Sequence, residues 1–168
     1  MKLSLLEFKT KSYLRRNKAM RVSLPYRQAM NIGVIFSVED RAKHDHVKEF
    51  VKHLEQDGKK VKVMCFLPKN KDNYEFLFDF FTEKDFTFWG NIASATAAKF
   101  AESSFDFLYY LDTTPNPLIL NLVARSKARC RIGKYWDEGQ PYFEMMIESK
   151  TGVRELIDAM YKYTLLLK

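Results

Sequence analysis

Hydrophobic and polar positions alternate along residues 31–168 in blocks whose lengths predict strands and helices in turn. The run Asn31–Val38 is almost continuously apolar, which is typical of a strand buried on both faces of a parallel sheet. Over Arg41–Gln56 the apolar residues recur at helical spacing, and Gly58 is placed to end that helix. The same reasoning predicts further strands at Val61–Leu67, Phe86–Trp89, Phe105–Leu111 and Arg131–Gly133, with Tyr142–Ile147 as an additional candidate.

Three more segments have helical character. They are Ala93–Glu102, a stretch that opens at Asn116-Pro117 and runs to about Ser126, and Thr151–Leu167. Asparagine followed by proline is a favoured helix start, because the side chain caps the helix and proline fits the first helical position. Residues 74–81 fit either a strand or a helical turn, and we expect a short helix there.

Strands and helices that alternate through short connections indicate a parallel sheet with helices on both faces. Right-handed crossovers favour the strand order 3-2-1-4-5, with one possible extra strand, in an open Rossmann-like α/β fold. We expect two parts in the chain: a basic N-terminal helix and linker over residues 1–30, and the Rossmann-like domain over residues 31–168.

The N-terminal segment carries the surplus charge. The chain has 28 Lys and Arg against 21 Asp and Glu, a formal net charge of +7, and residues 1–30 hold eight of the cations with one acid. Clustered cations attract polyanions through counterion release, so this segment predicts an anionic partner. The alternative is a solvated basic helix. Its short apolar face (Leu3, Leu6, Tyr13, Leu14) could lie on the domain, on a membrane or on a partner, and its candidate binding cations are Lys9, Lys11, Arg15, Arg16 and Lys18.

A second basic run lies late in the chain and has no acid within it. It is followed by Tyr135 and Trp136, and basic residues beside aromatic ones suit phosphate contact and base stacking on a nucleic acid. The alternative is a helix end that favours cations, leading into a strand with one face in water. The residues of this run are Arg125, Lys127, Arg129, Arg131 and Lys134.

Composition narrows the class of protein. Aromatic residues are abundant and Gly and Pro are scarce, which excludes collagen-like and wholly disordered chains. Cys65 and Cys130 alone indicate buried thiols of a reducing compartment rather than a disulfide scaffold. With no apolar run long enough for a membrane span and no signal-peptide core, we expect a soluble cytoplasmic domain.

Two segments carry a resemblance to known families. Phe105–Asp112 and Ser126–Gly133 resemble the end of the N-terminal Rossmann-type domain of heptosyltransferase-like (GT-B) glycosyltransferases. Together with Lys84–Gly90, they resemble more closely a family of short Bacteroidetes proteins of unassigned function. The glycosyltransferase likeness implies the fold and, at the first loop, Asp40 as the only residue to carry over as catalytic base. That loop lacks the glycosyltransferases' glycine, and we expect no donor-binding domain.

A ligand crevice is expected where the strand order reverses, at the carboxyl ends of the first and fourth strands. The sequence offers carboxylates there and no glycine-rich turn, which disfavours a dinucleotide or nucleoside triphosphate, so no cofactor is predicted. The alternative is that these residues cap helices and form turns. They are Ser37, Glu39, Asp40, Asp112, Thr113, Thr114 and Asn116.

His46, Glu49 and His53 lie at helical spacing and could share a divalent ion, but no further ligand is identifiable. Histidines near a helix surface usually face solvent, so no metal site is predicted. The sequence shows no nucleophile elbow, triad signature or P-loop.

The pattern therefore favours a binding domain over an enzyme. We expect a Rossmann-like domain that binds RNA or a ribonucleoprotein through its basic segments. Two alternatives stay open: a glycosyltransferase-like subunit that uses Asp40 as base and lacks its donor domain, and a peripheral protein attached to an anionic membrane surface by the basic helix.

Overall fold

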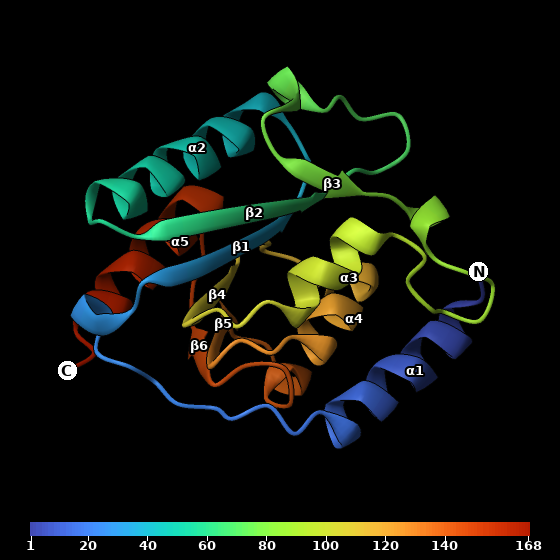
Figure 1. The fold of residues 1–168 in the computed structure, drawn as a ribbon. Helices are drawn as coiled ribbons and strands as arrows, with labels where there is room; N and C mark the ends of the chain where they lie inside the picture. Colours follow the sequence, from blue (N-terminus) through green and yellow to red (C-terminus); the bar gives the residue numbers. More distant parts are fainter.

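The computed structural model describes residues 1–168, apart from the side chain of Phe76. The described residues form an open sheet of six parallel strands in the order β3-β2-β1-β4-β5-β6 (Figure 1). The predicted α/β fold and strand order are confirmed, with β6 as the extra strand. The strands are β1 (Asn31–Ser37), β2 (Lys60–Phe66), β3 (Asp79–Phe81), β4 (Phe107–Tyr110), β5 (Cys130–Lys134) and β6 (Met145–Ile147). The α-helices are α1 (Leu3–Arg16), α2 (Arg41–Gln56), α3 (Ala95–Glu102), α4 (Pro117–Arg125) and α5 (Val153–Leu165).

The burial of the central strand β1 on both faces is what a parallel sheet covered by crossover helices requires. Every residue from Ile32 to Ser37 is buried, and β1 pairs with β2 on one side and β4 on the other. A strand buried on both faces needs helices above and below it, which the crossover helices supply. Gly33 permits close packing here, since a Cβ at this position would lie 2.6 Å from Phe105 Cδ2.

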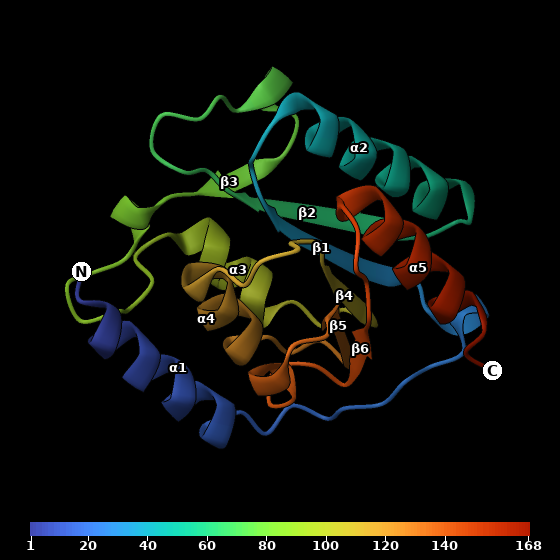
Figure 2. The same cartoon turned by 180° about the vertical axis from the view of Figure 1, so that it is seen from behind.

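Two apolar clusters cover the two faces of the sheet. Helices α2 and α5 pack on one face, through residues such as Phe50 and Leu156, and α3 and α4 pack on the other, through residues such as Phe100 and Ile119. Figure 2 shows α2 and α5 on one side of the sheet and α3, α4 and α1 on the opposite side. The buried thiols Cys65 and Cys130 belong to the sheet interior, as the sequence indicated.

The third strand is where the sequence interpretation was wrong. The expected short helix at 74–81 is a single 3-10 turn over Tyr74–Phe76 followed by β3, whereas the expected strand Phe86–Trp89 contributes only an isolated bridge from Phe86 to Ile92. Phe81 is fully buried between Phe66 and Phe86, and this contact sets the strand in place. Strand alternation therefore prevailed over the helical spacing of the same apolar residues.

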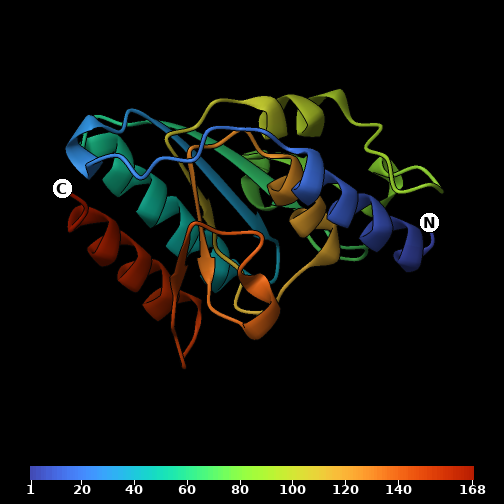
Figure 3. The ribbon, with the colours of Figure 1, turned by 90° about the horizontal axis from the view of Figure 1, so that it is seen from below.

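Helix α1 lies on the outer surface of α4. Leu6 is fully buried in the cluster between them, while Leu3, expected on the same face, is 59% exposed. Thr10 Oγ1 accepts a hydrogen bond from Asn121 Nδ2 (2.9 Å) inside the contact. Figure 3 shows α1 running beside α4, with the following linker crossing toward the C-terminal end of the chain.

None of the helices formed by the described residues has both the length and the apolar character that a membrane crossing requires.

Candidate functional site

The carboxyl ends of β1 and β4 meet, and the residues expected in a ligand crevice come together there. Ser37 donates twice to Asp112, from its backbone nitrogen (2.7 Å) and from its hydroxyl (2.6 Å). Asn116 Nδ2 donates to Ser37 Oγ (3.0 Å), while the Asn116 side chain also caps α4. These contacts tie the strand ends to the start of α4.

A lysine occupies the centre of this group. Lys43 Nζ lies 2.7 Å from Asp112 Oδ1 and 2.7 Å from Glu39 Oε1, and the side chains of Lys43 and Asp112 are each only 2% exposed. Lys43 stands in the first turn of α2, where the helix dipole disfavours a cation, so its charge depends on these two carboxylates. The expected crevice is thus filled by the protein's own ammonium group.

The remaining residues of the predicted crevice serve local structure. Asp40 Oδ1 caps α2 by accepting from Lys43 N (2.8 Å), and Thr113 O accepts from Lys134 Nζ (3.2 Å). Thr114 is exposed in the same loop. The sequence reasoning missed Lys43. The sequence does contain a signal for it. Lys43 follows Glu39 by four residues at the start of a helix, and a buried lysine needs an acidic partner of this kind.

The helical histidines do not converge on a metal position. In the part of the chain that the structure describes, no three His, Cys, Asp or Glu side chains are placed to hold an ion. His46, Glu49 and His53 line a hollow of about 60 Å³ together with α5, and the ring of His53 stacks on Tyr161 at 6.3 Å.

The two basic segments meet at the ends of α1 and α4. Asn17, which ends α1, donates through its Nδ2 to the carbonyls of Ala124 (3.0 Å) and Ser126 (2.8 Å) at the end of α4. Lys127 Nζ donates to Asn17 Oδ1 (3.0 Å). Residues more than 100 positions apart in the sequence therefore share one surface.

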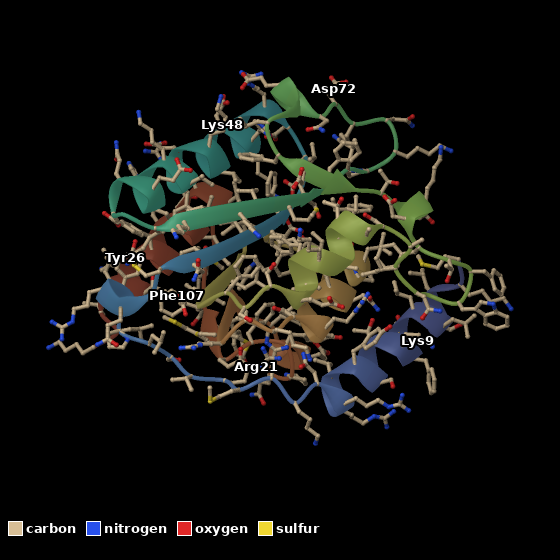
Figure 4. The ribbon with its side chains drawn as sticks, in the orientation of Figure 1. Lys9, Arg21, Tyr26, Lys48, Asp72 and Phe107 are labelled. Atoms are coloured by element: carbon tan, nitrogen blue, oxygen red, sulfur yellow. The ribbon has the colours of Figure 1, made fainter. Side chains whose placement is uncertain are left out.

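Contacts on either side extend this junction. The guanidinium of Arg125 lies over the ring of Tyr13 at 5.1 Å. Lys9 and Arg16 stand four residues before and three after Tyr13, so all three share one side of α1. We call Lys9, Arg16, Arg125 and Lys127 the basic surface. Figure 4 labels Lys9 on α1 and Arg21 on the segment that follows.

The cations of the basic surface are not held by ion pairs within the described chain. Among the described residues, no ion pair involves Lys9, Arg16, Arg125 or Lys127. Arg15, in the last turn of α1, and Lys18, just after that helix, are both exposed. Lys11 lies apart from it, in a groove of about 740 Å³ that α1 shares with the acidic Asp137 and Glu138.

Three cations of the second run have other surroundings. Arg131 is buried and forms a two-pronged contact with Glu144, Nη2 to Oε1 at 2.7 Å and Nε to Oε2 at 3.0 Å, so it cannot reach a partner. Arg129 lies 3.9 Å from Asp106. Lys134 Nζ donates to the Thr113 carbonyl, at the other end of β5 from Lys127. The predicted run is therefore divided, because the length of β5 separates Lys127, beside Asn17, from Lys134, beside Thr113.

Comparison with known proteins gives a family for this arrangement. The model of one protein family, a family of unknown function (DUF6913), matches residues 2–167. The chain belongs to this family. The DUF6913 match includes α1 as well as the α/β sheet. Neither the curated proteins nor the solved structures include a significant match to this DUF6913 chain.

Proposed function

We propose that this α/β domain binds a polyanion, with RNA as the partner, through the basic surface. The observation that carries the proposal is the meeting of two basic segments at Asn17, with no ion pair on these cations among the described residues. Cations that form no ion pair can contact phosphate without first breaking one, and the contact is favoured because counterions are released to solution.

The predicted strength of the salt dependence follows from the number of contacts. Each phosphate contact on a single strand contributes a slope of about 0.7 in log affinity against log salt. Four contacts would therefore weaken binding roughly 50-fold between about 50 and 200 mM salt. The planar guanidinium of Arg125, held over the ring of Tyr13, could also stack on a base.

A titration of labelled single-stranded RNA, read by fluorescence anisotropy at the two salt concentrations, tests this function. We expect Arg16→Gln with Lys127→Gln to weaken binding and to reduce the slope by about 1.4, two contacts' worth. Lys150→Gln with Lys162→Gln removes the same charge from exposed positions elsewhere and serves as the control. An equal loss in both pairs, or no binding at low salt, would overturn the proposal.

A second candidate, attachment to an anionic membrane surface, has an observation of its own. Phe88 and Trp89 lie in one turn and are 52% and 62% exposed, and the centroids of their two rings are 5.3 Å apart. This turn rests on α1, since a Cβ at Gly90 would lie 3.0 Å from Leu6 Cα. Exposed aromatics beside a basic helix suit the interfacial region of a bilayer.

Vesicle flotation separates the two candidates. Membrane attachment predicts that the chain floats with phosphatidylserine-containing vesicles but not with pure phosphatidylcholine, and that Phe88→Ser with Trp89→Ser abolishes flotation while RNA binding persists. Sedimentation of the wild-type chain away from both kinds of vesicle would remove this candidate.

The hypothesis that the chain is a glycosyltransferase-like subunit remains an alternative, with no observation in its favour. Asp40, its only carried-over base, has the ordinary N-cap role at α2.

A further inference from the structure

Strand β2 has an open edge. The pairing of β3 with β2 covers only Met64 to Phe66, so within the described residues Lys60–Val63 has a strand neighbour, β1, on one side alone. An uncovered edge presents backbone donors and acceptors that an added strand can satisfy.

The backbone hydrogen bonds at the two ends of β2 show which of its residues direct their backbone groups outward. Lys60 N donates to Met30 O (2.8 Å) on the β1 side, whereas Leu67 N donates to Phe81 O (2.9 Å) on the β3 side. Backbone groups alternate between the two sides along a parallel strand, so Val61 and Val63 turn theirs toward the open edge.

A groove of about 1060 Å³ runs along this edge between α2 and α3. Its two sides differ in chemistry. On the side of α2, Val51, Val61 and Val63 pack with the apolar cluster and supply apolar surface, flanked by charges of both signs on the helix: Lys48, Glu49, Lys52 and Glu55. Met64 packs in the opposite cluster, so Lys62, two residues earlier, faces α3, where Lys99 also lines the groove.

The charges of the groove do not cancel at these lysines. In the described part of the chain neither Lys62 nor Lys99 takes part in an ion pair, and both are exposed. Glu49 and Glu55 belong to α2, on the side of Val51, where Lys48 and Lys52 also lie, and Asp79 begins β3 at the end of the open stretch.

We propose that this edge takes up an extended segment of a partner protein, as an added strand in which apolar and acidic residues alternate. Its backbone would bond to Val61 and Val63, its apolar residues would face Val51, and its acidic residues would face Lys62 and Lys99. A second copy of this chain suits the groove poorly, because pairing two β2 edges would set Lys60 and Lys62 against their own copies.

The test uses the full chain and a fluorescent peptide of about six residues, a usual strand length, with alternating valine and glutamate. We expect saturable binding, slower amide hydrogen exchange at Val61 and Val63, and binding about tenfold weaker for a peptide of the same composition with its valines grouped. Lys62→Glu with Lys99→Glu should weaken binding by about tenfold, and Lys150→Glu with Lys162→Glu, a matched charge change outside the groove, should not.

Each opposite result overturns the proposal. These are absent binding, equal binding of the two peptides, equal loss in the two double variants, or unchanged exchange at Val61 and Val63. Sedimentation that shows dimers broken by Lys62→Glu with Lys99→Glu would assign the edge to a second copy instead.

Discussion

At the residue scale, the pair formed by Lys43 and Asp112 decides what the switch point can do. Both side chains are withdrawn from water, and each finds its counter-charge at 2.7 Å. Such a pair compensates the desolvation of its members only while both are present, since a lone buried charge has no solvent to stabilise it. Tyr110 lies beside this pair, and its hydroxyl accepts a hydrogen bond from Asn116 N (2.8 Å). Burial raises the pKa of Tyr110 well above its ordinary value, so its hydroxyl stays neutral.

Removing Lys43 alone should therefore be more harmful than removing the pair. We expect Lys43→Met to lower the free energy of unfolding by about 3–5 kcal/mol, because Asp112 is left charged and buried. Lys43→Met with Asp112→Asn should recover a large part of that loss. Urea unfolding of the three proteins measures both quantities, and a single variant within about 1 kcal/mol of wild type would contradict the assignment.

His44 is a second buried titratable residue. It is 1% exposed, its ring lies 5.4 Å from Tyr74 and 5.3 Å from Phe78, and neither nitrogen has a hydrogen-bond partner among the described residues. Burial is the main cause that lowers the pKa of His44 below 6.5; Lys48 adds to it and Glu75 opposes it.

This shift predicts an acid-sensitive fold. Because the folded state binds the His44 proton less readily than the unfolded state does, its contribution to stability is complete above pH 6.5 and decreases as the pH falls from 6.5 toward the lower, folded-state pKa. His44→Leu should flatten this part of the stability profile, measured by urea unfolding at several pH values. His53→Gln, at an exposed histidine, is the control, and an unchanged slope in His44→Leu would contradict the prediction.

At the scale of elements, the docking of α1 on α4 is the contact that brings the basic segments together. Leu6 is buried in the contact, and Asn121 donates a hydrogen bond to Thr10. Asn17, which ends α1, donates hydrogen bonds to the backbone carbonyls at the end of α4. The linker continues the contact, because Val22 N donates to Arg129 O (2.9 Å). On this packing we expect residues 1–30 to unfold together with the rest of the chain.

Leu6→Ala tests that expectation. We expect a loss of about 2–5 kcal/mol in global stability, as for other leucines removed from a packed core. Leu3→Ala, at a 59% exposed leucine of the same helix, should change stability by no more than about 0.5 kcal/mol. If both variants unfold at the wild-type urea concentration, α1 is an independent arm.

At the scale of the whole molecule, the two proposed binding surfaces lie on different parts of the fold. The basic surface lies where α1 and α4 end, while the open edge of β2 lies between α2 and α3. The two thiols lie inside the molecule, Cys65 on β2 and Cys130 on β5, and both belong to the apolar cluster beneath α2 and α5. Burial raises the pKa of Cys65 to about 12, and burial also raises the pKa of Cys130.

The thiols should thus report on opening of the entire fold. Cys65 and Cys130 are both 0% exposed, and thiolate is the reactive form, so a disulfide reagent at pH 8 should label the native chain only through unfolding. We expect labelling to accelerate in Leu6→Ala in proportion to its loss of stability. Fast labelling of native protein, independent of such destabilisation, would contradict the burial of these residues.

The sequence by itself determined the alternation of strands and helices, the sheet order and the start of α4 at Asn116, because these depend on periodicity and on capping within a few residues. It failed at β3, where strand and helix spacing overlap. Only the tertiary structure decided which charges are available. Arg131 and Lys127 look alike in sequence, yet Arg131 is paired with Glu144 and, among the described residues, Lys127 is in no ion pair. Lys43 pairs with Asp112, which lies 69 residues away in the sequence. Such pairs arise from which strand ends and helix ends meet, and local pattern does not encode that.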